Sequence, residues 1–417
     1  MPKFAHMSDV HIGAFRQPEL KELLLTSFDR AVDRCIQEEV EFVIISGDIF
    51  DSNIPDLVSV KRATGKIREA RERGIRFYVI YGSHDSSPNF ASIVDVLESA
   101  GLFTKVEKSS KLDGEVQLEF VRDQSGVSLC GISGKKLSMD RSDYEALAKG
   151  PLEKEPGVKI FVFHTAVEEL KPTSLQMMSG VPSGYLPEGF DYYAGGHVHE
   201  RSLNSLWGRK RVAFPGPLFA ADFRDLEPMA MGVERGFYLV DFERSGVKQV
   251  NFVPIKVAKV VELAYSAEGK SSKQAQTDLS TLVGSASVEG DVVLLKVSGQ
   301  LSSGKTSDID FADLRRRLTA KGPACVLPNY SQLTSREQVP IFAPLRSTQA
   351  TERDAFVRGI KSVSSTDPKL RGEKGVELSV DLLRTLKEEK RENETKAEYV
   401  SRTESSGLGV LGLEVDS

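Results

Sequence analysis

The segment "IRFYVIYGSHDSSPN", Ile75–Asn89, joins an apolar run to a corner that carries a serine, a histidine and an aspartate. The run is rich in β-branched and aromatic residues, which is typical of a strand. Gly82 ends the run and permits a tight turn of the backbone. His84 and Asp85 follow, so the corner places ionisable side chains at the end of a predicted strand. One such corner is weak evidence, because a single histidine after a strand is more often structural.

The same arrangement recurs along the first half of the chain. Five of the six histidines directly follow a strand-like run and stand beside glycine, aspartate or another histidine. The stretches are SDVHIG with Asp9 and His11, ISGDIFD with Asp48 and Asp51, YGSHD with Ser83, His84 and Asp85, VFVFHT with His164, and AGGHVHE with His197 and His199. Ligands of an open α/β sheet collect outside the carboxyl ends of its strands, so we expect these side chains to meet at one site. His6 is the exception, and we expect it to pack in the core or to support the ligands.

Histidine and carboxylate ligands without a thiolate suit manganese, iron or zinc, whereas calcium prefers oxygen ligands alone. An Asp-x-His pair places one oxygen and one imidazole on the same side of an extended segment. Gly195 and Gly196 let the backbone approach a bound group closely. The ligands outnumber what one ion needs. They suit two ions about 3.5–4 Å apart that share a bridging carboxylate and clamp a phosphate.

The composition is that of an ordinary soluble protein of two or three domains: 417 residues, 40% hydrophobic and 28% charged. No apolar run approaches the ~20 residues of a membrane span, and the N-terminal residues do not show a signal pattern. We therefore expect a cytoplasmic protein. Cys35, Cys130 and Cys325 lie far apart and are expected to be buried small residues. The net charge of −5 does not argue against nucleic acid, because metal-binding carboxylates contribute to it.

The distribution of elements predicts four regions. Strands alternate with helical patterns at 20–39, 57–74 and 89–101, and later strands come with few helices, which indicates a mixed or antiparallel second half. A β-α-β-α-β order comes after Pro254, then a polar, proline-containing stretch and an amphipathic tail. The predicted division is 1–254 for the main α/β domain, 255–333 for a small α+β domain, 334–372 for a linker and 373–417 for a helical region.

Together these motifs resemble the calcineurin-like metallophosphoesterase superfamily. The stretches HMSDVHIG, SGDIFDSNIP and YGSHDSSPN, with the small second domain, resemble one branch of it. That branch contains the nuclease subunits of DNA double-strand-break repair complexes, called SbcD in bacteria and meiotic-recombination-eleven in archaea and eukaryotes. The resemblance implies a four-layer α/β sandwich, a small α+β cap domain over the DNA, and a C-terminal helical tail that binds a partner.

The resemblance also implies roles for individual residues. Asp9, His11 and His199 would hold one Mn²⁺, Ser83, His164 and His197 the second, and Asp48 would bridge the two. His84 would contact the scissile phosphate or act as general acid, Asp85 would orient His84 or its loop, and Asp51 would face the substrate. Most family members have Asn where this chain has Ser83, whose hydroxyl is shorter and less negative. The second metal site is therefore expected to be weaker than in those relatives.

The sequence signals for contacts with DNA and protein partners are less specific than those for the metal ligands. Arg16, Ser87 and Asn89 stand near the motifs and could contact DNA, or could be solvent-facing loop residues. By resemblance, helices near 57–71 and 89–100 would form a homodimer, although such helices commonly pack on their own sheet. The tail helices would dock on the coiled coil of an SMC-like ABC ATPase, or would be disordered or pack on themselves.

The predicted function is that of a manganese-dependent DNA nuclease, nucleoid-associated in the cytoplasm, with 3′–5′ exonuclease and single-strand endonuclease activity on DNA ends. One alternative is a generic metallophosphoesterase such as a cyclic-nucleotide phosphodiesterase. The cap and the tail argue against it, since a small-molecule enzyme needs neither. Another is a DNA-repair scaffold weakened by Ser83, against which the other intact ligands argue.

Overall fold

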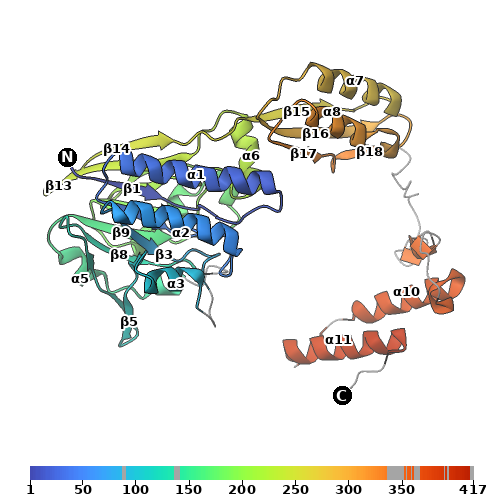
Figure 1. Cartoon of the computed structure of the whole chain (residues 1–417). Coiled ribbons are helices and arrows are strands. Elements are labelled where there is room, and N and C mark those ends of the chain that lie inside the picture. Colours follow the sequence, from blue (N-terminus) through green and yellow to red (C-terminus); the bar gives the residue numbers. More distant parts are fainter. Residues whose placement is uncertain are drawn as a thin grey trace. The chain divides into compact units, whose positions relative to one another are not determined.

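The computed structural model describes residues 1–86, 91–135 and 141–335, and, of the rest, 352–353, 355–357, 359–360, 367–388, 390–391 and 394–413. The chain divides into two compact units, Met1–Glu337 and Gln338–Ser417. Figure 1 traces the elements of both along the sequence.

The first unit contains a six-stranded sheet with the order β14-β13-β1-β2-β3-β4. Its strands are β1 (Lys3–Met7), β2 (Phe42–Ser46), β3 (Arg76–Ile80), β4 (Thr104–Lys105), β13 (Gly236–Glu243) and β14 (Gly246–Pro254). The strands β1 to β4 are parallel, whereas β13 and β14 form an antiparallel edge. The carboxyl ends of β1, β2 and β3 therefore lie at the same side of the sheet.

A second six-stranded sheet has the order β11-β12-β10-β9-β8-β7. Its strands are β7 (Val121–Arg122), β8 (Ser128–Ile132), β9 (Lys159–His164), β10 (Tyr192–Gly196), β11 (Ser202–Leu206) and β12 (Arg209–Phe214), and a separate hairpin is formed by β5 (Ser109–Leu112) and β6 (Glu115–Leu118). Four central strands are parallel and both edge strands are antiparallel. The mixed sheet predicted for this part of the chain is thus present.

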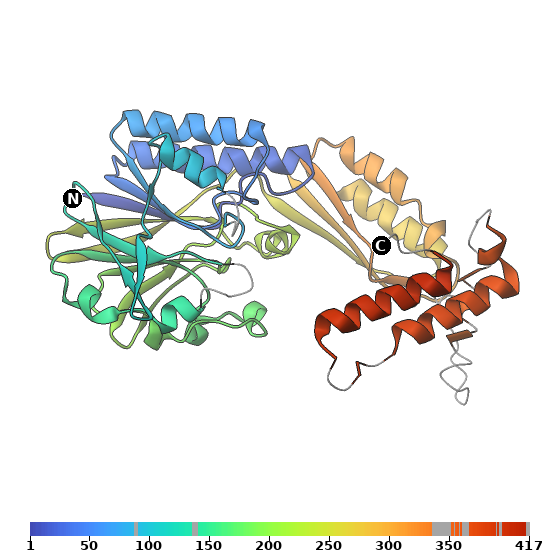
Figure 2. The ribbon, with the colours of Figure 1, turned by 90° about the horizontal axis from the view of Figure 1, so that it is seen from below.

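The two sheets pack face to face, and helices cover the outer face of the first. The helices of this region are α1 (Pro18–Gln37), α2 (Leu57–Glu72), α3 (Ile93–Ser99), α4 (Arg141–Glu145), α5 (Lys149–Lys154) and α6 (Phe223–Ala230). Figure 2 shows α1 and α2, in blue, lying along one face of the first sheet. The 3₁₀ turns Glu168–Leu170, Thr173–Leu175 and Ser183–Tyr185 lie with α4 and α5 near the outer face of the second sheet. This arrangement confirms the predicted four-layer α/β sandwich.

The sequence of β2 shows how the layers form. All five residues of this strand, FVIIS, are buried, because the strand is covered on both faces. Successive side chains point to opposite faces, so Phe42 and Ile44 enter the core between the sheets, whereas Val43 and Ile45 contact the helices. In α1, buried apolar residues recur at helical spacing and pack with Val43 and Ile45 on the helix-covered face of the sheet.

A smaller α+β part, here called the cap unit, completes the first unit. It contains β15 (Val260–Ser266), β16 (Val292–Leu301), β17 (Cys325–Asn329), β18 (Leu333–Ser335), α7 (Ser272–Ser285) and α8 (Phe311–Thr319), with a 3₁₀ turn at Thr306–Asp308. One face of its sheet packs on α7 and α8. On the other face, Val260, Val292 and Leu294 belong to the same core cluster as residues of α1. The cap unit is therefore packed on the main domain through a shared apolar core.

The second unit contains a pair of helices, α10 (Gly372–Leu386) and α11 (Lys396–Leu411), preceded by a 3₁₀ turn at Pro368–Leu370. Thr395 caps α11 and Glu398 closes the capping box. No helix in the described ranges is long and apolar enough to span a membrane. The three cysteines are free, with Cys35 and Cys130 buried and Cys325 half-buried.

Candidate metal centre

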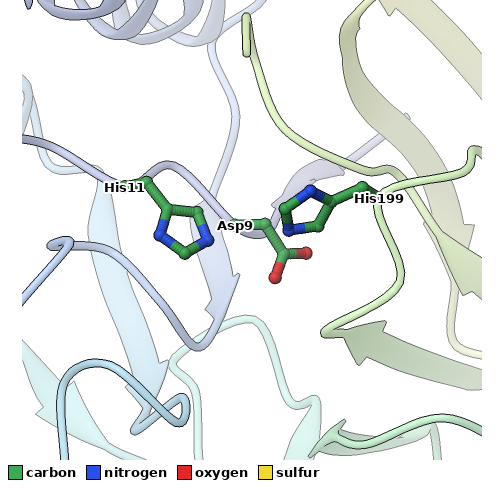
Figure 3. A group of neighbouring side chains, drawn as sticks. All are labelled: Asp9, His11 and His199. Atoms are coloured by element: carbon green, nitrogen blue, oxygen red, sulfur yellow. The ribbon is translucent and has the colours of Figure 1, made fainter. Parts of the chain in front are cut away.

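The five sequence motifs meet where the carboxyl ends of strands from both sheets come together. Asp9 and His11 follow β1, Asp48 and Asp51 follow β2, Ser83, His84 and Asp85 follow β3, His164 ends β9, and His197 and His199 follow β10. Figure 3 shows His11, Asp9 and His199 converging, the last from a segment far from the others in sequence. The topology thus collects these residues as expected for ligands at strand ends.

Three overlapping groups of side chains could each hold a metal ion. They are Asp9 with His11 and His199, Asp9 with Asp48 and His164, and His11 with Asp48 and His84, the ligand atoms of each group lying within 4.8 Å of one another. Asp9 and Asp48 each belong to two groups. Shared carboxylates of this kind suit two adjacent cations, since each carboxylate offers two oxygens.

The Asp48 carboxylate occupies the centre of the cluster. Its Oδ2 atom lies 3.2 Å from Nε2 of His164 and 3.7 Å from Nε2 of His11. Its Oδ1 atom accepts a 2.7 Å hydrogen bond from the backbone N–H of His84, which fixes the orientation of the group. One oxygen therefore stands between a histidine of each sheet, as a bridging ligand requires.

Unsatisfied polar atoms support the same interpretation. Oδ2 of Asp9 and Nε2 of His11 are buried and have no hydrogen-bond partner among the described residues. Leaving such atoms unpaired costs about 1–3 kcal/mol each, and more for a charged group. Metal coordination satisfies a carboxylate oxygen and an imidazole nitrogen together, so the residues present fit a pair of metal ions.

Each of three imidazoles is held at Nδ1, which directs its Nε2 atom inward. His164 Nδ1 lies 2.7 Å from the carbonyl oxygen of Ser46, and His199 Nδ1 lies 3.0 Å from Oδ2 of Asp225. His11 Nδ1 lies 3.2 Å from Oδ1 of Asp51. Such outer contacts commonly set the tautomer and orientation of metal-binding histidines.

Four of the predicted ligands have an uncommon backbone conformation. The φ angles of Asp9, His11, Asp48 and His197 are 51°, 48°, 50° and 80°. Non-glycine residues rarely occupy this left-handed region, and those that do cluster at functional sites. The strained backbone aims these side chains at the cluster instead of along the usual direction of the strand.

Burial and charge have opposing effects on the histidine pKa values. Burial lowers the pKa of His164, but the charge and hydrogen bonding of Asp48, with the charge of Asp9 and the Ser46 carbonyl, together outweigh burial and raise the pKa to about 10. For His11, burial is outweighed by Asp51 and the neighbouring carboxylates, which raise the pKa to about 9. Burial lowers the pKa of His197 to about 4, reinforced by the charge of His164. The carboxylates thus favour the protonated, positively charged form of His164 and His11. A metal cation at the same position would satisfy the carboxylates in place of these protons.

His84 and Asp51 lie at the exposed side of the cluster. The His84 side chain is 47% exposed, and its Nδ1 atom lies 2.9 Å from the carbonyl oxygen of Asp51. Its ring meets that of His11 edge to face, with centroids 4.7 Å apart. Nδ1 being engaged, His84 has Nε2 left for a group arriving from solvent. Asp51 Oδ1 lies 3.6 Å from His84 Nδ1, so it also contacts this ring.

Asp85 joins two loops of the cluster. Its buried carboxylate accepts hydrogen bonds from the backbone N–H groups of Ile49, Phe50 and Gly82, at 3.0–3.1 Å. Burial, with the nearby charge of Asp48, raises the Asp85 pKa to about 6. The side chain thus connects the loop after β2 to the corner after β3. Of the two roles expected for Asp85, this contact corresponds to orienting the loop.

The close approach of Asp48 explains why a glycine, Gly82, stands at the corner after β3. A Cβ atom on Gly82 would lie 2.0 Å from Oδ1 of Asp48. Gly196 is constrained in the same way, since its Cβ would lie 2.0 Å from the carbonyl oxygen of Ser46. Only glycine lets these segments approach the cluster so closely.

The remaining predicted site residues lie at the border of the cluster or outside it. Ser83 Oγ donates to Oδ2 of Asp48 over 3.4 Å, and the His197 backbone N–H donates to Oδ1 of Asp9 over 2.9 Å. The rings of His197 and His164 have centroids 5.4 Å apart. His197 therefore borders the closest groups of histidine and carboxylate ligands, and Ser83 lies beside the shared Asp48 carboxylate. Arg16 is exposed on the loop after β1, whereas Ser87 and Asn89 fall outside the described residues.

Sequence reasoning missed two buried charged residues, Asp225 and Arg235. Arg235 pairs with Asp225 at 3.0 Å and also donates to the carbonyl oxygen of His199. Burial would raise the Asp225 pKa, but the hydrogen bond and charge of His199, with Arg235, lower it to about 2. Neither residue stands beside a histidine or a strand-end motif, so local spacing gave no signal. His6, by contrast, lies in the core and contacts Tyr192 Oη and Ser46 Oγ at 2.9 and 2.8 Å.

The N-terminal part of the chain, which contains these residues up to His199, matches one protein-family model. It is the calcineurin-like phosphoesterase model, and it matches residues 2–201. Residues 2–201 form a calcineurin-like phosphoesterase domain. The resemblance, the α/β fold and the class of metal-dependent phosphoesterase predicted from sequence are thereby confirmed.

Over a longer stretch, the chain is similar to several proteins named DNA double-strand break repair protein Mre11. The Archaeoglobus fulgidus protein is 27% identical over 330 residues, 75% of this chain and 70% of that protein. Those of Methanopyrus kandleri and Methanococcus maripaludis are 27% and 26% identical over 63% and 60% of this chain. The alignments to these two span 59% and 66% of the relatives.

Among solved structures, a dimetal phosphatase from Danio rerio aligns with a TM-score of 0.34 and 10% identity, over 61% of this chain and 99% of that protein. That similarity is too slight to support a conclusion about this chain.

Proposed function

We propose that the chain is a manganese-dependent DNA nuclease that hydrolyses phosphodiesters at a two-metal site and acts in double-strand-break repair. The single observation that carries the proposal is the position of Asp48, whose Oδ2 atom lies between His11 of one sheet and His164 of the other. The phosphoesterase domain supports phosphate-ester hydrolysis. The names of the Mre11 relatives favour DNA as the substrate.

The residues divide into two ligand sets and a group that faces the substrate. Asp9, His11 and His199 would hold one Mn²⁺, and Ser83, His164 and His197 the other, with Asp48 shared. Bound ions of this kind supply Lewis acidity and lower the pKa of water toward neutrality. The mixture of imidazole and carboxylate donors suits manganese, although it also accepts iron or zinc.

His84 is the residue we assign to the leaving group. Its ring lies half-exposed beside the cluster, with Nδ1 engaged by the Asp51 carbonyl. Nε2 would contact the scissile phosphate or donate a proton to the departing 3′ oxygen. Asp51, in contact with both His11 and His84, would keep the two rings in place. Asp85 would act on neither ring directly and would hold the loops that present them.

Partner contacts are proposed from exposed apolar residues. Ile54 just before α2 is 78% exposed, Leu57 and Val58 in its first turn are 80% and 78% exposed, and Val96 of α3 is 56% exposed. Exposed apolar residues gathered at two helices are typical of an interaction site, which we assign to a homodimer contact. Arg16 and the cap unit would contact the DNA backbone, and Ser87 and Asn89 remain candidates by sequence.

The second unit is the proposed partner-binding tail. Leu386 of α10 and Val400 of α11 are 49% and 52% exposed, so the pair of helices leaves apolar side chains uncovered. We propose that this helical pair docks on the coiled coil of an SMC-like ATPase, in the helix-in-groove manner. Association with the nucleoid would follow from these DNA and ATPase contacts.

The test is cleavage of end-labelled single-stranded and double-stranded DNA by the full chain in Mn²⁺, Mg²⁺ or chelator, beside His84→Ala. We expect manganese-dependent degradation that the variant loses. Hydrolysis of p-nitrophenyl phosphodiesters with intact DNA would favour a small-molecule phosphodiesterase. If neither substrate is cleaved even with the ATPase partner present, the protein is a scaffold and the nuclease proposal fails.

A further inference from the structure

Two buried charged side chains, Asp225 and Arg235, contact the proposed metal ligand His199 on the side away from the other ligands' Nε2 atoms and carboxylates. Oδ2 of Asp225 lies 3.0 Å from Nδ1 of the His199 ring, and Arg235 donates to the backbone carbonyl oxygen of the same histidine. Asp225 and Arg235 also pair with each other at 3.0 Å, with side chains 8% and 4% exposed. Both the ring and the main chain of His199 are therefore fixed by one buried ion pair.

The Asp225 carboxylate belongs to a helix that reaches the cap unit. Asp225 stands in the first turn of α6, and its carboxylate also accepts the backbone N–H of Ala221. Two residues further along, Glu227 pairs with Lys296 of β16 at 2.9 Å, and Lys296 pairs with Glu262 of β15 at 3.3 Å. One short helix thus contacts the metal ligand at its start and the cap sheet shortly afterwards.

Arg235 provides a second connection. Its carbonyl oxygen accepts a 2.8 Å hydrogen bond from the backbone N–H of Ile255, just after β14. Ile255 leads directly to β15 and packs against the same core cluster as Val260. The Glu227–Lys296 ion pair and the backbone hydrogen bond between Arg235 and Ile255 therefore both link the cap unit to the residues that hold His199.

We propose that Asp225 and Arg235 are positioning residues that fix His199 and couple its position to the cap unit through α6. The inference rests on the proposed metal-dependent function and specifies how that site is regulated. Because coupling between two sites is reciprocal, metal binding should stabilise the cap contacts, and a displaced cap should weaken the metal ligand. Glu227 and Lys296 also line a hollow of about 570 Å³ on the cap sheet, so a group bound there would contact the Glu227–Lys296 pair.

The first arm of the test is calorimetric titration of the full chain with Mn²⁺. In Asp225→Asn, one amide oxygen must replace two carboxylate oxygens that serve His199 and Arg235. We expect one of the two Mn²⁺ ions to bind about 10–100-fold more weakly, as is usual when an outer partner of a ligand is lost. Asp222→Ala is the matched control, since it removes the cap of the same helix without touching His199.

The second arm measures amide hydrogen exchange with and without Mn²⁺. In the wild-type chain, Mn²⁺ should slow exchange in Phe223–Ala230 and Val260–Ser266. Lys296→Met removes the ion pairs of a half-buried side chain at the surface of β16, so the fold should be retained, and the slowing in Val260–Ser266 should be lost. Lys248→Met, which breaks the pair between Lys248 of β14 and Glu243 of β13, should leave the slowing unchanged.

The outcomes separate this inference from the proposed function. If the wild-type chain binds two Mn²⁺ ions but Asp225→Asn binds both as tightly, the positioning role is wrong while the metal site stands. If Mn²⁺ slows exchange in the cap equally in wild type and Lys296→Met, the coupling through α6 is wrong. If the wild-type chain binds no Mn²⁺, the proposed function and the inference both fail.

Discussion

Oδ2 of Asp48 lies 3.2 Å from Nε2 of His164, although the first residue follows β2 of one sheet and the second ends β9 of the other. This contact exists only because the two sheets pack face to face with their strand ends at one side. A carboxylate and an imidazole held together in a buried place are stable when a proton or a metal ion lies between them. The proposed two-metal site depends on this junction of the sheets.

Replacing Ser83 with Asn should strengthen the second metal site. The Ser83 hydroxyl reaches Asp48 Oδ2 only at 3.4 Å, whereas an amide oxygen extends farther and is a better donor to a cation. We expect the weaker Mn²⁺ of the full chain to bind about tenfold more tightly, a change within the range of single-residue effects on metal sites. Calorimetric titration measures it, with Ser86→Asn as control. An unchanged isotherm would remove Ser83 from the ligand set.

Removing the Asp85 carboxylate should separate the loops that it joins. In Asp85→Ala, three buried backbone N–H groups lose their acceptor, and we expect the metal-free protein to lose about 3 kcal/mol or more of stability. Asp85→Asn retains one oxygen and should lose less. Urea unfolding measures both variants. Stability equal to the wild type in Asp85→Ala would show that the loops are held by other contacts.

A carboxylate far from the metal site should make stability depend on pH. Asp123 is bonded by Arg76 at 2.6 Å and by Tyr78 at 2.7 Å. Burial raises its pKa, but the hydrogen bonds from Ser125, Tyr78 and Arg76 outweigh it and lower the pKa.

Because the folded-state pKa of Asp123 lies below the ordinary value of about 3.9, its stabilisation is complete above that value and is lost as the pH falls further. We expect Asp123→Asn to unfold more easily than the wild type by about 1–3 kcal/mol at pH 7, the usual contribution of charge-assisted hydrogen bonds. Urea unfolding should show this difference shrinking toward pH 2. A difference that grows on acidification would contradict the sign of the shift.

The exposed apolar residues at the start of α2 should control the oligomeric state. Leu57→Glu places a charge at a position that is 80% exposed, so the fold should be retained while a dimer contact there is lost. Light scattering after gel filtration should show a dimer for the wild type and a monomer for the variant. Leu112→Glu, at an exposed position on the β5–β6 hairpin, should remain dimeric. A dimeric Leu57→Glu protein would place the contact elsewhere.

Much of the candidate site could be predicted because its proposed ligands occupy repeated local positions. Asp9, His11, Asp48, His84, His164 and His199 each stand at or just after the end of a strand, and the topology of parallel strands brings such residues together. Asp225 could not be found this way. Its role arises from the place of α6 in the fold, and an aspartate in the first turn of a helix is ordinary for capping alone.

Other features depend on three-dimensional packing and left no local signal. The left-handed backbone at Asp9 and His197 occurs where the two sheets meet, and the two residues are joined there by the hydrogen bond from His197 N–H to Asp9 Oδ1. The sequence near Pro254 indicated a separate small domain, yet Val260 and Val292 share a core with α1. The apolar residues of these strands do not reveal from sequence whether they contact the helices of the small domain or α1 of the main domain.

The most direct test of the two-metal site is the rate of Mn²⁺-dependent cleavage of end-labelled single-stranded DNA by wild type and Asp48→Asn. Asparagine keeps the shape of the side chain and can still accept the His84 backbone N–H, but it removes the negative charge that a bridging position needs. We expect the rate to fall by at least about 10³-fold. Asp113→Asn, the same change on an exposed turn, should retain full activity. Equal cleavage by Asp48→Asn and wild type would contradict the two-metal site.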